Sequence, residues 1–187
     1  CLCKNKKHKE SIKYAELLLI SMKEYDSFLH DKYLFFYYNI LVSNYAKTDK
    51  DKALDYLDKA SSNEVIKKLP SYTSFIYLNK ALVYFHEDNF SQAQKNISRL
   101  ILQEDFLLLD KAFQLKVLIA DVIIRFKNGY HDIIDRIKDI RKNHKQLLLD
   151  EEYVRDKEMI NIISKKINDG DVEDDKKRIL SFMSDYD

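Results

Sequence analysis

The sequence predicts an all-α protein, built as an α-solenoid in which antiparallel helix pairs are stacked on one another. Three observations predict this fold. Apolar residues recur at helical spacings, the pattern repeats with a step of 40 residues, and the 187 residues include only 2 Gly and 1 Pro. An average chain of this length contains roughly 13 Gly and 9 Pro. This deficit argues against hairpin-built β folds and glycine-rich phosphate loops.

The helical spacing is clearest in three segments. In residues 12–22 the apolar positions are three or four residues apart, which places them on one face of a helix. Residues 33–46 are apolar nearly all round, and a helix of this kind is buried on more than one side. Residues 51–60 return to the one-sided pattern. We therefore expect successive helices that pack on each other.

The step of 40 residues relates columns of apolar positions in the chain. The columns are Ala53, Ala93 and Ile133; Leu57, Ile97 and Ile137; Ala60, Leu100 and Ile140; Leu69, Leu109 and Leu149; and Tyr37, Tyr77 and Val117. A fixed period between about 20 and 50 residues is typical of stacked repeats. The columns therefore predict that equivalent helices recur along the chain.

Each period holds two helices joined by a short polar turn, and we interpret residues 1–187 as a single helical-repeat domain. The first helices are expected at 32–46, 72–86, 111–127 and 151–167, and the second at 51–60, 91–102, 131–143 and 172–184. The repeats span 30–70, 71–110 and 111–150, with a partial repeat at 1–29 and a degenerate repeat or cap at 151–187. The segment after each second helix, such as 61–71, is expected to hold an extra turn or short helix. Gly129 and Gly170 occupy the same turn, where a left-handed residue commonly ends a helix.

The N-terminal segment has two interpretations. Its residues look like a repeat whose first helix is cut away, which favours a fragment of a longer, cytoplasmic protein. Alternatively, Cys1 is the mature N-terminus of a bacterial lipoprotein anchored in the envelope. Cys1 and Cys3 are the only cysteines and form no disulfide framework, which favours a reducing compartment. The longest uncharged run, 33–46, is shorter than the ~20 apolar residues of a spanning helix, so no transmembrane segment is expected.

The charge balance is flat. The chain has 32 basic and 31 acidic residues, and its formal net charge is +1. Nucleic-acid-binding proteins usually have a basic excess or a basic stripe. The short basic run from Lys4 to Lys9 is interpreted as a solvated turn or helix start. We therefore expect no direct contact with nucleic acid.

Sequence motifs of catalytic, cofactor and metal sites are absent. The chain has no G-x-S-x-G, H-E-x-x-H or C-x-x-C motif, and its five histidines are scattered. Cys1, Cys3 and His8 are an incomplete zinc set, because structural zinc takes four ligands. Residues 168–171 are similar to the start of a calcium loop but lack its later Gly and Glu. We expect no enzymatic activity, no cofactor and no bound metal.

The helix pairs resemble tetratricopeptide repeats, most closely in the second repeat. Five positions carry the match: Tyr77 at the motif's Trp, Ala81 at its small residue, Tyr84 at its Tyr, Phe90 at the aromatic before the second helix, and Ala93 at its Ala. The step is 40 residues rather than the usual ~34, and Asp121 stands where the motif has a small residue. The resemblance implies a right-handed superhelix that binds a partner. The richness in Lys, Asn, Ile and Tyr is similar to that of helical-repeat proteins of Bacteroidetes-type bacteria.

The same resemblance implies that the first helix of each pair lines a concave face. The binding positions would be Tyr38, Asn39, Val42 and Tyr45 in the first repeat, Leu78, Asn79, Leu82, Phe85 and His86 in the second, and Arg125 in the third. Phe35, Phe75, Leu118, Ile119, Val122 and Phe126 would extend this face.

Two features of this face suggest how a partner would be held. Asn39 and Asn79 are one period apart, and a carboxamide offers both a donor and an acceptor to a peptide backbone. Arg125 would anchor an acidic group of the partner. Other aromatic residues, including Phe36, Tyr37 and Tyr56, are at core spacings and are expected to be buried.

The leading hypothesis is therefore a protein–protein or peptide-binding scaffold module that uses the concave face of a helical solenoid. One alternative is a regulatory or peptide-sensing domain of a larger transcriptional or signalling protein. A second alternative is a lipid-anchored envelope scaffold. The partner would be another protein or a peptide segment.

Overall fold

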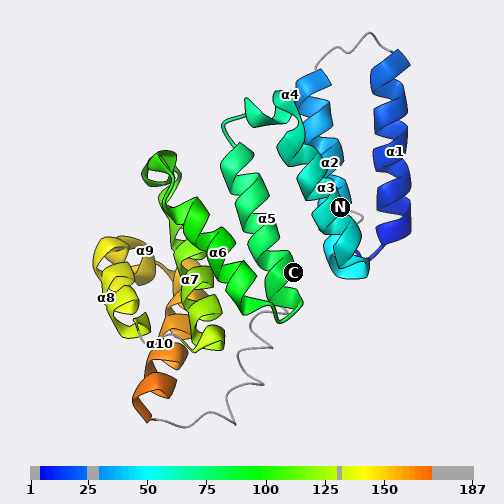
Figure 1. The fold of residues 1–187 in the computed structure, drawn as a ribbon. Coiled ribbons are helices and arrows are strands. Elements are labelled where there is room, and N and C mark those ends of the chain that lie inside the picture. Colours follow the sequence, from blue (N-terminus) through cyan, green and yellow to red (C-terminus); the bar gives the residue numbers. More distant parts are fainter. Residues whose placement is uncertain (1–4, 25–29, 130–131, 170–187) are drawn as a thin grey trace. The chain divides into compact units, whose positions relative to one another are not determined.

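The computed structural model describes residues 5–24, 30–129 and 132–169, and within these ranges the chain is helical throughout. Helices take up 87% of the described residues, and no strand occurs among them. The elements are α1 (His8–Glu24), α2 (His30–Thr48), α3 (Lys50–Ser62), α4 (Glu64–Lys67), α5 (Tyr72–His86), α6 (Phe90–Ile101), the 3-10 helix η1 (Glu104–Leu108), α7 (Lys111–Asn128), α8 (Ile133–Asn143), α9 (Lys145–Leu149), the 3-10 helix η2 (Glu151–Tyr153) and α10 (Val154–Asp169) (Figure 1). The prediction of an all-α protein is confirmed.

The chain divides into two compact units, Cys1–Asp88 and Asn89–Asp187, which we call unit 1 and unit 2. The border lies inside the predicted repeat 71–110, between α5 and α6. The single domain over 1–187 and the repeat boundaries stay predictions. The helix expected at 172–184 lies outside the described residues, as do Cys1, Cys3 and Gly170.

The step of 40 residues has a simple structural basis. After each of the second helices α3, α6 and α8 comes a short helical segment, which is α4, η1 or α9 respectively. These segments are the extra turns predicted from sequence, and they lengthen each period beyond that of a plain helix pair. All nine residues of the three columns on these second helices are buried, with at most 3% of their surface exposed: Ala53, Ala93, Ile133, Leu57, Ile97, Ile137, Ala60, Leu100 and Ile140.

Polar residues at the predicted turns set the helix ends. The carboxylate or amide oxygens of Asp49, Asn89 and Asp110 each accept a backbone N–H three residues along, so they cap α3, α6 and α7. Gly129 ends α7 in the left-handed region at φ 76°, and its N–H points back to the carbonyls of the last turn. The prediction that a glycine terminates this helix is confirmed.

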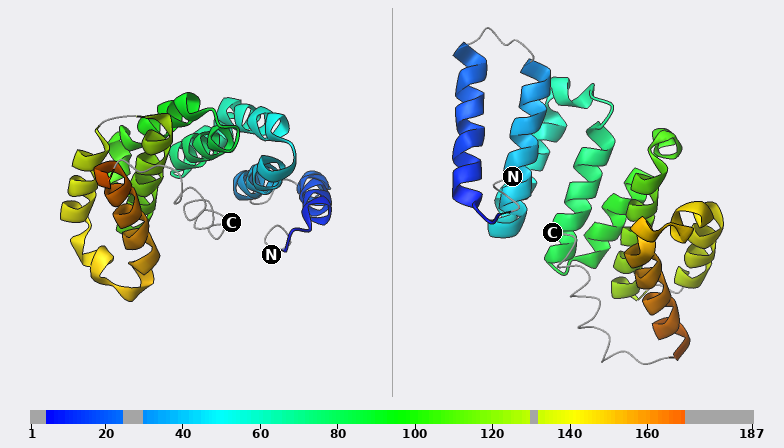
Figure 2. Two further views of the ribbon diagram at one scale, coloured as in Figure 1. Left: turned by 90° about the horizontal axis from the view of Figure 1, so that it is seen from below. Right: turned by 180° about the vertical axis from the view of Figure 1, so that it is seen from behind.

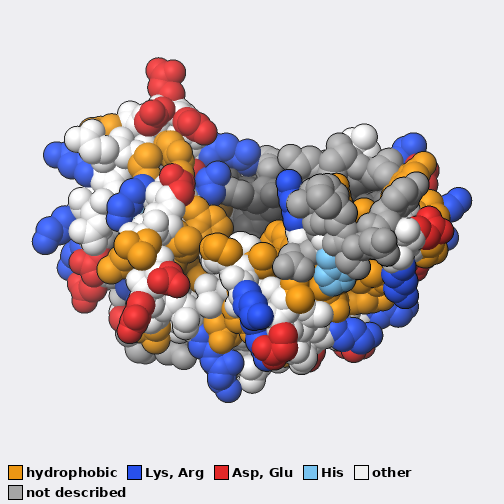
Figure 3. Space-filling model, turned by 90° about the horizontal axis from the view of Figure 1, so that it is seen from above, with side chains coloured by type: hydrophobic (Ala, Val, Ile, Leu, Met, Phe, Trp, Pro, Cys, Tyr) orange, Lys and Arg blue, Asp and Glu red, His pale blue; other side chains and the backbone are white. Residues whose placement is uncertain are grey.

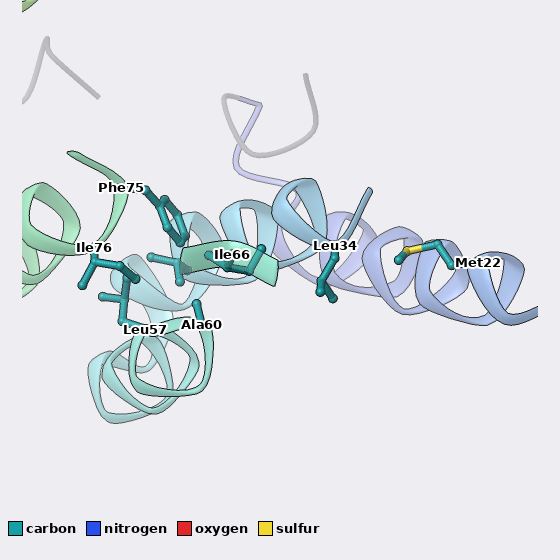
Figure 4. Close-up of a cluster of buried hydrophobic side chains, with 8 residues drawn as sticks. Met22, Leu34, Leu57, Ala60, Ile66, Phe75 and Ile76 are labelled. Carbon is teal, nitrogen blue, oxygen red and sulfur yellow. The ribbon is translucent and has the colours of Figure 1, made fainter. Parts of the chain in front are cut away.

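In unit 1, α1, α2 and α3 lie side by side and α5 packs against α2 and α3 (Figures 1 and 2). Helix α2 is apolar nearly all round because it has α1 on one side and α3 and α5 on others. The core cluster drawn in Figure 4 contains Met22 of α1, Leu34 and Val42 of α2, Leu57 and Ala60 of α3, Ile66 of α4, and Phe75 and Ile76 of α5. Burial of these side chains joins α1, α2, α3, α4 and α5.

A buried amide fixes how α1 packs on α2. Asn44 has no exposed surface, and its Nδ2 donates to Ser11 Oγ at 2.9 Å and to the Ile40 carbonyl at 2.7 Å. His8 Nδ1 lies 3.0 Å from Asn44 Oδ1. Buried polar groups need such partners, so this cluster specifies one register of α1 along α2.

In unit 2, α7 packs against α6, α8 and α10. Its apolar side chains are buried on several sides, as those of Leu115, Val122 and Ile124 show. Met159, Ile160 and Ile163 of α10 are each at most 1% exposed. Among the described residues, no helix combines the length and the apolar composition that a membrane crossing requires.

Candidate functional site

The predicted binding positions of unit 1 lie on α2 and α5, which meet through two phenylalanines. The rings of Phe35 and Phe75 pack edge to face with their centres 5.1 Å apart. These residues are 40 positions apart, so this contact joins equivalent points of the two predicted repeats. One helical turn beyond them are Asn39 and Asn79, both partly exposed.

The two asparagines differ in their surroundings. Asn39 lies on α2 between Phe35 and Phe36, and Phe36 is 41% exposed. Asn79 lies on α5 between Phe75 and Ile76, and Ile76 belongs to the core with α3. Asn79 Nδ2 also donates to the Phe75 carbonyl at 2.7 Å. Asn39 therefore borders the exposed stripe of its helix, whereas Asn79 borders the core.

Two predicted binding residues are buried, so the expectation that they are exposed is wrong. Val42 has no exposed surface and belongs to the core cluster, because α2 packs on α3 and α5 through this side. Phe85 is only 8% exposed. Ile119 and Val122, which were expected to extend the face, are buried in unit 2. The resemblance to tetratricopeptide repeats therefore predicts the helices correctly, but for these residues it predicts the wrong side of the helix to face solvent.

Phe36, in contrast, was expected to be buried and is exposed. Its side chain is 41% exposed, and the Lys32 ammonium lies 6.0 Å from its ring centre. On α5, Leu82 is 38% exposed and His86 is exposed. We call the surface formed by Lys32, Phe36 and Asn39 of α2 and by Leu78, Leu82 and His86 of α5 the α2–α5 face. Residues on each helix are three or four positions apart, so they share a side of it.

Tyr38 and Tyr45 contact α3 instead of facing α5. Tyr45 stacks on Tyr56 of α3 with ring centres 5.5 Å apart and planes 7° apart. Lys52 lies 5.5 Å above the Tyr45 ring and Lys59 lies 4.9 Å above the Tyr56 ring. These cation–π contacts form a row of tyrosines and lysines on the α2–α3 surface.

Tyr38 lies at one end of this row. It lines a shallow depression together with Asp58, Lys59, Ser62 and Asn63. Burial raises its pKa above 10.0, although the Lys59 charge acts in the opposite direction. The neighbouring Tyr37 has its pKa raised to about 12, by burial first and then by Tyr56. These hydroxyls therefore stay protonated at neutral pH.

Arg125 is held inside unit 2 by an ion-pair network. Its side chain is 11% exposed; its Nε donates to Asp121 Oδ2 at 2.9 Å and its Nη1 to Asp132 Oδ2 at 2.9 Å. Arg136 pairs with the same two carboxylates, at 3.2 Å and 3.1 Å. The expectation of an exposed Arg125 that anchors an acidic partner is therefore wrong, because two carboxylates already neutralise it.

The network explains an irregularity of the sequence. Asp121 replaces the small residue of the repeat motif, is 1% exposed, and also accepts from Gln94 Nε2 at 2.8 Å. The substitution is visible in the sequence, but its partners are not, because Gln94 and Arg136 come from neighbouring helices. A buried aspartate four residues before an arginine was the signal that could have indicated the pair.

Within the described ranges, no three His, Cys, Asp or Glu side chains are grouped as a metal ion would need. On the face drawn in Figure 3, acidic and basic side chains are interspersed with hydrophobic ones.

In comparisons with protein-family models, curated proteins and solved structures, nothing matches the chain. The likeness to tetratricopeptide repeats therefore rests on the sequence pattern and on the helical packing. Any function must be argued from the surfaces and cavities of the chain itself.

Proposed function

We propose that the protein is an interaction module that binds a peptide segment or another protein through the α2–α5 face of unit 1. The observation that carries the proposal is the pair of large apolar side chains on neighbouring helices, Phe36 at 41% and Leu82 at 38% exposure. Exposed apolar groups with polar neighbours are typical of interaction surfaces. Asn39 adds a carboxamide beside Phe36, and His86 adds an imidazole one turn beyond Leu82.

The proposal includes the finer architecture. The helix pairs are arranged as a tetratricopeptide-like, right-handed solenoid, and the first helices α2 and α5 offer the binding positions. The nine buried column residues and the Phe35–Phe75 contact at a spacing of 40 residues support this arrangement. Stacked repeats use one row of helices for binding and leave the other row for packing.

The test is a selection of peptides displayed at random in sequence against the full chain, followed by titration of the selected peptides. Phe36→Ser combined with Leu82→Ser should weaken binding at least tenfold, because truncating two interface anchors removes more than ~1.4 kcal/mol. Ile20→Ser is the matched control, since Ile20 is 53% exposed on α1 and lies outside the face. Far-ultraviolet circular dichroism checks that all variants stay helical.

Two outcomes count against the proposal. Selected peptides that bind the double variant as tightly as the parent chain would remove the α2–α5 face from the function. A selection that yields no peptide whose binding saturates would remove peptide binding itself. Equal losses in the double variant and in Ile20→Ser would indicate general apolar adhesion instead of a site.

A further inference from the structure

Unit 2 contains a cavity of about 680 Å³ that the proposed function does not use. Its walls come from the end of α6, from η1, and from facing sides of α7 and α8. The volume is within the range of small-ligand pockets, roughly 300 to 1,000 Å³. Three polar residues of α7 line it at helical spacing, namely Lys111, Gln114 and Asp121.

Most polar groups deep in this cavity are already satisfied. Gln114 Nε2 donates to the carbonyls of Leu107 and Leu109 at 3.1 Å and 2.7 Å, and its Oε1 accepts from Lys111 Nζ at 3.2 Å. Asp121 is held by two arginines and by Gln94. These contacts give the cavity a rigid wall.

His144 is the exception. Its side chain lines the cavity and is only 5% exposed, yet its buried Nδ1 has no hydrogen-bond partner among the described residues. Burial lowers the pKa of His144, and the charge of Lys111 lowers it further. The ring is therefore neutral at neutral pH, and the Lys111 ammonium is a positively charged neighbour. A buried nitrogen without a partner is unfavourable unless a ligand supplies one.

The remaining lining restricts the ligand further. Leu118 and Ile140 form apolar wall, and Leu107, which is 72% exposed, lies at the rim. The exposed carboxylates of Glu104 and Asp139 also line the cavity, as does the Asp121–Arg136 ion pair, and these carboxylates repel any anionic group that a cation does not hold. The cavity therefore fits one anionic group joined to an apolar body.

We propose that this cavity binds a small amphipathic monocarboxylic acid. Its carboxylate accepts hydrogen bonds from Lys111 Nζ and from His144 Nδ1–H, and its apolar body packs against Leu118, Ile140 and Leu107. The ammonium has further hydrogens beyond the one directed to Gln114, so it can donate to a carboxylate while it keeps that hydrogen bond. This ligand site is separate from the α2–α5 face and does not depend on the proposed function.

The experiment titrates the full chain with 4-phenylbutyrate and, separately, with its neutral isostere 4-phenylbutyramide. Calorimetry measures affinity, and nuclear magnetic resonance follows the histidine ring signals against pH. The acid should bind at least about tenfold more tightly than the amide, because a charge-assisted hydrogen bond is lost in the amide. Bound carboxylate should also raise the pKa of His144, because it stabilises the imidazolium.

Variants locate the site. Lys111→Met keeps the apolar stem and removes the charge, so affinity for the acid should fall about tenfold. Lys116→Met is the matched control, since Lys116 is exposed on the same helix and does not line the cavity. His144→Phe should weaken binding of the acid and leave a smaller preference for acid over amide, because Lys111 remains, while thermal unfolding shows that the protein remains folded.

Equal affinities for acid and amide overturn the proposal, as does binding that survives Lys111→Met unchanged. Absence of binding together with an unmoved His144 pKa overturns it as well. A peptide with a C-terminal phenylalanine and a free carboxylate provides the last arm. If it binds while 4-phenylbutyrate does not, the cavity is a peptide site and the assignment to a small acid is wrong.

Discussion

In unit 1 the polar side chains that lie deepest are neutral, whereas in unit 2 several of them are charged. Among the described residues of unit 1, the buried polar ones are Asn44 and Ser11, and a histidine joins them. Unit 2 buries Asp121, Asp156 and Lys166, each at most 5% exposed. A neutral amide fixes helix register at a small desolvation cost. A buried charge is costly unless it is paired, so unit 2 depends more strongly on each partner.

This difference predicts the largest mutational effect. Asp121→Ala removes one of the two carboxylates, Asp121 and Asp132, that pair with both Arg125 and Arg136, and Arg125 is 11% exposed. Breaking a buried pair by removing one partner costs about 3–5 kcal/mol, because the remaining charge stays desolvated. Urea denaturation of the variant gives the loss of unfolding free energy.

The control for this variant is Asp135→Ala. Asp135 is 80% exposed and pairs with Lys138 at 2.9 Å, so its removal should cost at most about 0.5 kcal/mol. Similar losses in the two variants would show that burial does not govern the ion pairs of unit 2.

The corresponding change in unit 1 is Asn44→Ala. It removes the hydrogen bonds to Ser11 and His8 and leaves the Ser11 hydroxyl buried, at a cost of about 1–3 kcal/mol. Hydrogen exchange should show faster opening of α1 than of α3, because the lost contacts join α1 to α2. Asn39→Ala, a partly exposed change on the same helix, should leave exchange in α1 unaltered. Uniform acceleration across unit 1 would contradict a role in holding α1.

One ionisable group in each unit links stability to opposite ends of the pH scale. In unit 1 the pKa of Tyr37 is raised from 10.0 to about 12, so its contribution is complete below pH 10 and is lost as the pH rises towards 12. In unit 2, burial alone would raise the pKa of Asp132, but the hydrogen bond from Arg136 and the charge of Arg125 lower it below 3.8. Its contribution is therefore present above the unfolded pKa and is lost as the pH falls through the folded value.

The histidine of the cavity acts in the same direction as Asp132. The folded pKa of His144 lies below 6.5, so protonation favours the unfolded chain as the pH falls below that value. Methyl resonances separate the units, with Ile66 and Ile76 reporting unit 1 and Ile137 and Ile163 reporting unit 2. We expect the methyl signals of unit 2 to be lost first in acid and those of unit 1 to be lost first in alkali. Simultaneous loss at both extremes would contradict separate pH dependence, and Tyr37→Phe should reduce the alkaline loss, to which Tyr38 also contributes.

The sequence predicts features that depend on spacing within one helix better than features that depend on contacts between helices. Helix positions and the inward columns depend on spacing within one helix, so residues such as Ala53, Ile97 and Ile140 were placed correctly. The side of a helix that stays exposed depends on which neighbours cover it. Val42 and Phe36 were misassigned because α2 is covered by α1, α3 and α5 at once.

Polar residues were harder to interpret for the same reason. Asp121 lies in α7 and His144 in the turn between α8 and α9, and their roles depend on groups that come from other elements. Arg136 reaches Asp121 from the next helix, and Lys111 acts on His144 from 33 residues earlier in the chain. The spacing of residues within one helix cannot indicate such contacts between different elements.

The helix-ending turns extend the comparison to smaller effects. Gly129 of unit 2 has φ 76°, and a Cβ placed there would meet no atom within 4 Å. Gly129→Ala therefore costs conformational energy without a clash, about 1–2 kcal/mol. Thermal unfolding gives the size of the loss. A loss well above this range would indicate a packing role for the turn that the open surroundings do not provide.

Unit 1 ends its corresponding turn with Asp88, a non-glycine residue at φ 56°. Here the substitution runs the other way: Asp88→Gly should relieve the left-handed strain and stabilise the protein. The gain is limited, because Asp tolerates this conformation better than most residues and because glycine adds freedom to the unfolded chain. We expect a gain of about 0.5 kcal/mol, measured by the same thermal unfolding. Asp88→Ala is the control and should destabilise the protein, since alanine keeps the Cβ but loses the polar side chain. If Asp88→Gly were no more stable than Asp88→Ala, backbone strain would not limit the stability of this turn.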